Sequence, residues 1–159
     1  MHSKIIVATL AAALTACQPA PTTMPTAVPA TPVPTDTPAP AVTGADVLAA
    51  FVAAGLEAEG ARPMTVDDYG LAPYVCGDDA TRFYVPSLGP DLGGRVYACQ
   101  DAADADMLAR YYEELGKASA MLHSHVMRGA GGRVLVQING SLDAETAGRY
   151  AVVIAGLGE

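Results

Sequence analysis

The chain has 159 residues, of which 51% are hydrophobic and 16% are charged, and its formal net charge is −8. This composition lies within the globular range and excludes a wholly disordered or collagen-like chain. Nine basic residues against 17 acidic ones argue against a nucleic-acid partner and against a polybasic grip on anionic lipid. The sequence therefore predicts one modest domain together with specialised ends.

Residues 1–16 are predicted to form a signal peptide. Lys4 precedes an uncharged apolar run over residues 5–14, which is too short for a membrane-spanning helix and fits a secretory signal. The run ends in Leu14-Thr15-Ala16-Cys17, which resembles the lipobox of bacterial lipoproteins. The resemblance implies cleavage before Cys17, a diacylglycerol thioether on its sulfur, and acylation of the new amino terminus. The competing interpretation is an ordinary cleaved signal with an incidental Cys.

Two or three acyl chains make a lasting membrane anchor. The lipobox thus implies an extracytoplasmic protein held by lipid at the cell membrane or the outer membrane. Gln18 stands where an Asp would signal retention at the inner membrane, so such retention is not signalled.

Residues 17–43 comprise the lipidated Cys and a linker. Eight of the 12 prolines and seven threonines fall between Gln18 and Thr43. Proline removes backbone donors and fixes φ, so this segment is expected to be an extended spacer that holds the domain away from the lipid.

Residues 44–159 are predicted to form an α+β globular domain. Thr43 and Asp46 are typical of a capping box, and Gly55-Leu56 of a helix end. Strands are expected over 81–85, 95–99, 122–128 and 133–139, with a helix from Asp101 to Gly116 and a last helix capped by Ser141 or Asp143. The order α-β-β-α-β-β-α predicts a two-layer domain with a four-stranded, largely antiparallel sheet and about three helices.

The domain contains a set of short motifs: Phe51, Gly55-Leu56, Arg62-Pro63-Met64-Thr65, Phe83, Pro86-Ser87, Gly93-Gly94-Arg95-Val96 and the run from Val134 to Gly140. Over most of the domain, this pattern is similar to a group of small exported bacterial proteins, many of them lipoproteins, with no established activity. The similarity implies no site residues.

The sequence contains neither a Gly-x-Ser-x-Gly elbow nor a phosphate loop. Adjacent acids such as Asp67-Asp68 and Glu113-Glu114 are interpreted as solvated carboxylates, because neighbouring side chains on a helix or strand point apart. Asp101, Asp104 and Asp106 lack the glycine and terminal Glu of a calcium loop and are interpreted as helix-start acids. No catalytic residue and no cofactor are predicted.

Once Cys17 is acylated, Cys76 and Cys99 remain as an even pair in an exported chain. The predicted hairpin brings them together, and a disulfide between them is expected. The alternative is two separately buried thiols.

Met121, His123, His125 and Met127 alternate and would share one face of a strand. Thioether and imidazole suit copper, so His123 and His125 are the candidate ligands of a copper or zinc site. The alternative is that they are ordinary packing residues.

The favoured function is a non-catalytic binding or interaction domain displayed on the anchor, with an envelope protein as its expected partner. A metal-binding protein is the second hypothesis, and an envelope enzyme the third.

Overall fold

A computed structural model describes residues 42–77 and 79–158. The predicted signal peptide, Cys17 and nearly all of the predicted linker lie outside these residues. No helix among the described residues is long and apolar enough to cross a membrane.

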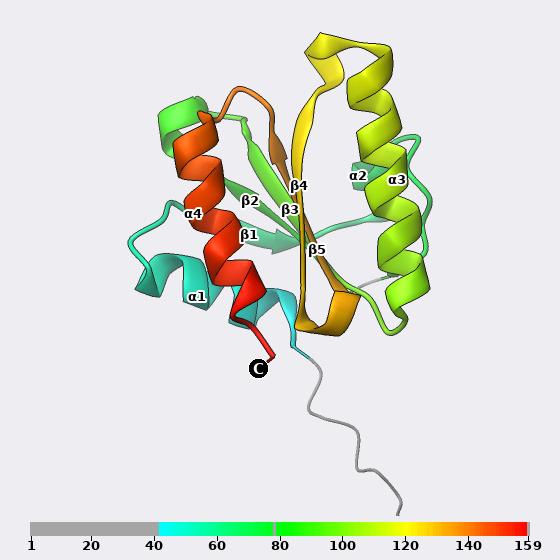
Figure 1. Cartoon of the computed structure of the whole chain (residues 1–159), viewed down its shortest axis with the longest axis horizontal. Helices are drawn as coiled ribbons and strands as arrows, with labels where there is room; N and C mark the ends of the chain where they lie inside the picture. Colours follow the sequence, from blue (N-terminus) through cyan, green and yellow to red (C-terminus); the bar gives the residue numbers. More distant parts are fainter. Residues whose placement is uncertain (1–41, 78, 159) are drawn as a thin grey trace, which may run out of the picture. The chain divides into compact units, whose positions relative to one another are not determined.

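One sheet of five strands forms the centre of the domain, in the order β1-β2-β3-β5-β4 with every neighbouring pair antiparallel (Figure 1). In chain order the elements are α1 (Gly44–Ala53), β1 (Glu59–Pro63), α2 (Val66–Tyr69), β2 (Ala80–Tyr84), β3 (Gly93–Ala98), α3 (Ala102–Ala118), β4 (Ser124–Gly129), β5 (Val134–Asn139) and α4 (Ala144–Ala155). Three 3₁₀ turns lie between them: η1 (Pro86–Leu88), η2 (Ala120–Leu122) and η3 (Ala130–Gly132).

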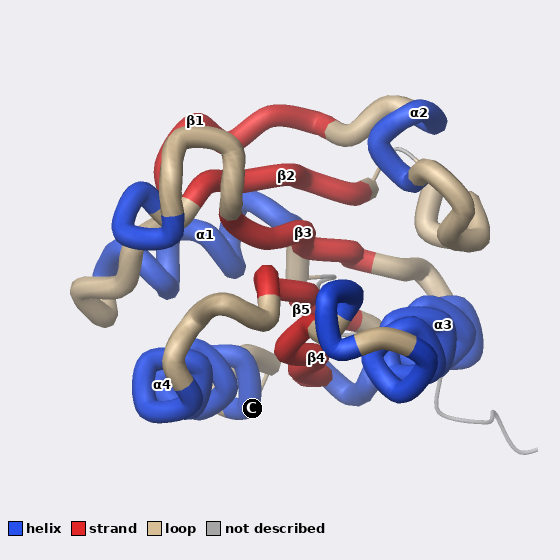
Figure 2. The backbone as a smooth tube through the Cα atoms, turned by 90° about the horizontal axis from the view of Figure 1, so that it is seen from above, coloured by secondary structure: helices blue, strands red, loops and turns tan. Residues whose placement is uncertain are grey.

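Helices cover both faces of this sheet, with α1 and α4 on one side and α2 and α3 on the other (Figure 2). Phe51 of α1 and Tyr150 of α4 pack with Val96 in one buried cluster. Leu108 of α3 packs with Tyr97 in a second cluster on the opposite face. Val96 and Tyr97 are neighbours on β3, so the two cores follow from the alternation of side chains along one strand.

The helix ends follow the chemistry expected from the sequence. Thr43 and Asp46 form a reciprocal capping box at the start of α1, and Asp101 caps α3 by accepting from the backbone N–H of Ala103. Gly55 has φ +69° after α1, and the N–H of Leu56 reaches back to the carbonyl of Phe51. This is the Schellman arrangement, in which a left-handed residue closes the helix.

The prediction of an α+β domain with an antiparallel sheet is confirmed, but its details were wrong. Within residues 42–77 and 79–158 the sheet has five strands instead of four, four helices replace three, and helices on both faces make three layers instead of two. The helix expected to end at Gly116 runs on to Ala118, since an internal Gly costs only about 1 kcal/mol in a helix held by its packed face.

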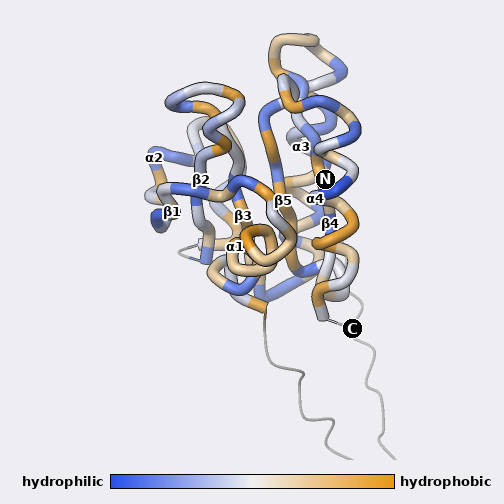
Figure 3. Tube along the Cα trace, turned by 90° about the vertical axis from the view of Figure 1, so that its left-hand side faces the viewer, coloured by the Kyte–Doolittle hydropathy of each residue, from blue (hydrophilic) through white to orange (hydrophobic). Residues whose placement is uncertain are grey.

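β1 was missed because its sequence carries no strand signal. Glu59–Pro63 has neither a β-branched nor an aromatic residue, and most of its side chains are exposed. Figure 3 shows β1 as largely hydrophilic and β5 as largely hydrophobic. β1 is an edge strand with an irregularity after Glu59, where Gly60 has φ +58°. Edge strands accept Pro and bulges, so pairing with β2 overrides the weak local preference.

Candidate functional site

Three of the seven arginines of the chain stand side by side across the sheet. Arg62 of β1 is paired with Arg82 of β2, and Arg82 is paired with Arg95 of β3. We call these three residues the arginine row. Side chains directly opposite on antiparallel strands lie about 5 Å apart at Cβ, and like charges in such positions are destabilising. The row therefore needs negative charge from elsewhere.

Asp68 of α2 supplies one compensating carboxylate. Its two oxygens accept from the two terminal nitrogens of Arg62 at 2.8 and 2.6 Å, and one of them lies 3.9 Å from Arg82 Nη1. The hydrogen bond from Arg62, and then that from the Thr65 backbone N–H, hold the pKa of Asp68 well below its usual value. Asp68 is thus an ionised counter-ion for the β1 end of the row.

Arg95, at the other end of the row, has no such partner. Its Nη1 donates to Gln137 Oε1 at 2.9 Å, while its buried Nε has no hydrogen-bond partner. Among the described residues, no carboxylate lies within ion-pair distance of Arg95. An unsatisfied buried polar group costs about 1–3 kcal/mol. Arg95 thus has a buried N–H without an acceptor and a positive charge without a neighbouring carboxylate in the described part of the chain.

Gln137 holds Arg95 in place. It is paired with Arg95 across β3 and β5, it is 5% exposed, and its Nε2 donates to Ser124 Oγ on β4 at 2.9 Å. A buried amide satisfied on both sides has a fixed orientation. The guanidinium of Arg95 is therefore positioned by a chain of hydrogen bonds that extends across three strands.

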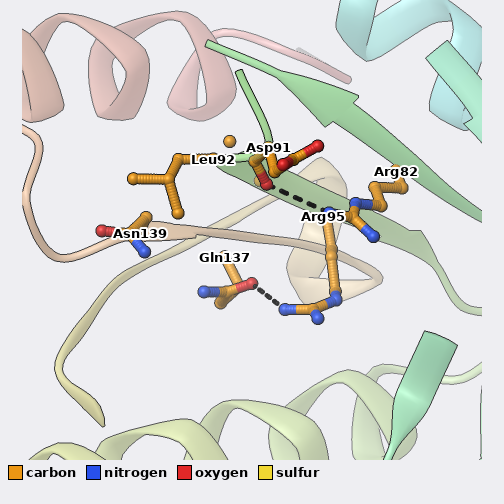
Figure 4. Close-up of a pocket in the computed structure, with 8 residues that line it drawn as sticks. Arg82, Asp91, Leu92, Arg95, Gln137 and Asn139 are labelled. Atoms are coloured by element: carbon orange, nitrogen blue, oxygen red, sulfur yellow. Dashed lines mark hydrogen bonds between the residues drawn. The ribbon is translucent and has the colours of Figure 1, made fainter. Parts of the chain in front are cut away.

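A cavity of about 150 Å³ lies beside Arg82 and Arg95, and Figure 4 shows it with the residues that line it. Leu92, Gln137 and Asn139 add to its wall, and Asp91 lies on it with an exposed side chain. Arg82 Nη2 donates to the backbone carbonyl of Asp91 at 3.1 Å. We call this space the arginine cavity.

The two glycines at the start of β3 have different roles. Gly93 shares its face of the sheet with Arg95 and brings no side chain to it. A Cβ on Gly94 would come within 2.6 Å of the Phe83 ring and of the Gln137 carbonyl oxygen, so glycine is required there for packing. The Gly-Gly pair thus serves the cavity with one residue and the core with the other.

Two buried tyrosines, Tyr97 of β3 and Tyr112 of α3, lie on the same face of the sheet as Arg95. The hydroxyls of Tyr97 and Tyr112 are 2.5 Å apart and buried. Burial raises the pKa of both phenols, so both remain protonated at neutral pH and add no charge near Arg95.

The predicted disulfide is confirmed. Cys76 and Cys99 are bonded, with their Cα atoms 4.6 Å apart and both side chains buried. The bond ties the segment that follows α2 to the end of β3. It thereby fixes the part of the chain that carries Asp68 to the strand that carries Arg95.

The alternating Met and His residues do not form one face of a strand. Met121 lies in η2, before β4, and is 96% exposed, whereas Met127 is buried against the α1 and α4 side. The rings of His123 and His125 do lie together, 5.3 Å apart, with His125 Nε2 2.8 Å from the carbonyl of Leu142. No group of three or more His, Cys, Asp or Glu suited to a metal occurs in residues 42–77 and 79–158. Metal binding by the two histidines stays a prediction.

Several of the acidic residues that the sequence singled out have structural partners. Asp101 caps α3, Glu113 bonds Arg128 and Glu114 bonds Lys117. The arginine row was not predicted at all. The expected hairpin of residues 81–85 and 95–99 puts Arg82 and Arg95 on neighbouring strands, but it does not give the register that pairs them.

Comparison with protein-family models, with curated proteins and with solved structures finds no match for this chain. Its function must therefore be argued from its own residues.

Proposed function

We propose that this protein is an exported lipoprotein whose folded domain is a non-catalytic binding module, and that the arginine cavity binds a small oxyanion. The observation that carries the oxyanion is the arginine row, in which three arginines are paired across β1, β2 and β3 and Asp68 is bonded to Arg62 at one end. A bound anion beside Arg82 and Arg95 would supply the missing negative charge.

Two observations support export and anchoring through Cys17. The first is the lipobox-like sequence before Cys17. The second is the disulfide between Cys76 and Cys99, a bond that persists in oxidising compartments and is rare in the cytosol. The anchor would be embedded in the cell membrane or the outer membrane, with the domain on the extracytoplasmic side.

The position of the cavity suits display from such an anchor. The described chain begins at Val42, which shares a surface hollow with Thr81, Ala98 and Arg133. Ala98 ends β3, whereas the arginine cavity lies at the opposite end of that strand, beside Gly93. The strand between them spans about 17 Å at 3.3 Å per residue. The first described residue therefore lies at the end of β3 away from the cavity.

A fractionation experiment tests the anchor. Wild-type protein is expected in the membrane fraction with diacylglycerol on Cys17, detected by intact-mass analysis, and Cys17→Ser is expected to lose both.

The oxyanion site is tested by thermal unfolding of the full chain in detergent with phosphate, sulfate, malonate or acetate at constant ionic strength. At least one oxyanion should raise Tm for the wild type and for Arg110→Gln, but not for Arg95→Gln. Equal shifts in the two variants would contradict the site.

A further inference from the structure

The arginine cavity presents donors to its ligand and few acceptors. Asn139 Oδ1 accepts from the Ser141 backbone N–H at 2.9 Å, and Gln137 Oε1 accepts from Arg95. Figure 4 shows the amide nitrogen of Asn139 on the side of Gln137, with its oxygen turned away. Asn139 therefore offers its amide N–H groups to the cavity, because its oxygen is engaged within the protein, whereas the nitrogen of Gln137 donates to Ser124.

The arginines add more donors than one carboxylate can accept. A guanidinium has five N–H groups, and the bonds described above use one of Arg95 and one of Arg82 for neutral acceptors. A carboxylate has two oxygens, which accept about four hydrogen bonds, all close to one plane. The donors here come from three strands, so an anion with oxygens in several directions satisfies more of them.

Charge and size favour the same kind of anion. Arg62 is matched by Asp68, which leaves Arg82 and Arg95 as two positive charges, offset at the rim by the exposed Asp91. A phosphate group carries a charge of about −1.5 to −2 at pH 7. A cavity near 150 Å³ is known to hold a molecule of about six non-hydrogen atoms, and a phosphate or sulfate group has five.

We infer that the arginine cavity binds a tetrahedral dianion, a phosphate or sulfate group, either as the inorganic ion or at the end of an ester. Arg95 and Arg82 contact its oxygens, the Asn139 amide nitrogen donates to a further oxygen, and Gln137 is a positioning residue that orients Arg95. This inference rests on the proposed oxyanion site and specifies its ligand.

Titration calorimetry of the full chain in detergent tests the ligand at constant ionic strength. The probes are inorganic phosphate, glycerol 3-phosphate, sulfate, acetate and malonate. Phosphate and sulfate should bind at least tenfold more tightly than either carboxylate. Glycerol 3-phosphate distinguishes the sources, because an ester that binds as well as the free ion shows that the cavity accepts a group on a larger molecule.

Two variants probe the site without a large change of shape. Asn139→Asp keeps the oxygen that accepts from Ser141 but replaces the amide donors with negative charge, and should weaken phosphate binding at least tenfold. Gln100→Glu adds the same charge at an exposed position past the other end of β3 and should have little effect. Arg95→Gln should abolish binding, whereas Arg110→Gln, the matched change on α3, should not.

The pH dependence identifies the dianion. A phosphate monoester has a second pKa of about 6, so lowering the pH from 7.5 to 5 should weaken glycerol 3-phosphate about tenfold. Sulfate binding should stay constant, and it controls for protonation of the groups around the cavity. These groups are Asp68, Asp91, Tyr84, Tyr97, Tyr112 and the arginine row, while His123 and His125 line a separate hollow beside Tyr112.

The outcomes separate this inference from the oxyanion site itself. Carboxylates that bind more tightly than phosphate and sulfate, with loss in Arg95→Gln, would overturn the tetrahedral ligand and keep the site. Anion binding that is equal in Arg95→Gln and Arg110→Gln, or absent from the wild type, would overturn both.

Discussion

Removing the disulfide should destabilise the domain by an amount that its loop length sets. Cys76 and Cys99 are 23 positions apart, so their bond closes a loop that contains β2, η1 and β3. In the chain-entropy model a loop of this length stabilises the folded state by about 3.4 kcal/mol at 25 °C. For a domain of about 116 residues, unfolding entropies near 2.1 cal/mol/K per residue convert this into a fall in Tm of about 14 °C.

Urea and thermal unfolding of Cys76→Ala/Cys99→Ala measure this loss. The control is wild-type protein that is unfolded, reduced and refolded in reductant, because it lacks the bond but keeps both sulfur atoms. If the double variant and the reduced wild type lose the same stability, the lost stability comes from the cross-link and not from packing. Cys17→Ser is a second control, because it removes the third Cys and leaves the bond intact. A double variant whose Tm lies within about 3 °C of wild type would refute the loop argument.

Three further predictions concern the sheet and the histidines. Asp68 has a lowered pKa in the folded state, so its contribution to stability is present above about pH 4 and is lost as the pH falls. Urea unfolding at decreasing pH should therefore show that the stability difference between wild type and Asp68→Asn shrinks in acid. Gly94→Ala should cost about 1–3 kcal/mol in urea unfolding, because its Cβ would strike Phe83. If His123 and His125 bind Cu(I), competition with a Cu(I) chelator should show uptake that falls at least tenfold in the double Ala variant; no uptake by the wild type would end that hypothesis.

Local signals account for the parts of the fold that could be predicted from the sequence. The capping residues Thr43 and Asp101 and the helix end at Gly55 act within a few positions, so their chemistry is legible in a short window. The hairpin of β2 and β3 follows from two strand-like runs around a turn. The pairing of Cys76 with Cys99 then follows from that hairpin.

The remainder depends on contacts between distant segments. β1 forms because β2 offers an open edge for pairing, and the sequence of Glu59–Pro63 itself does not predict a strand. The second layer of helices had a cue in β5, where Val134–Ile138 is buried on both faces and interrupted only by Gln137. The arginine row depends on the register of β1, β2 and β3. Because α2 lies between β1 and β2 in the chain, no local sequence pattern predicts that register.

The most direct test of the central claim is an NMR titration that follows the Nε–H resonances of the arginines. The sample is the ¹⁵N-labelled full chain carrying Cys17→Ser, titrated with phosphate at constant ionic strength up to about 10 mM, a range that detects millimolar affinity. The account predicts a saturable shift of the Arg95 Nε–H, whose nitrogen has no partner in the folded domain, while the Arg110 resonance stays in place. Equal, non-saturating shifts of all the arginines, or no shift of Arg95, would contradict it.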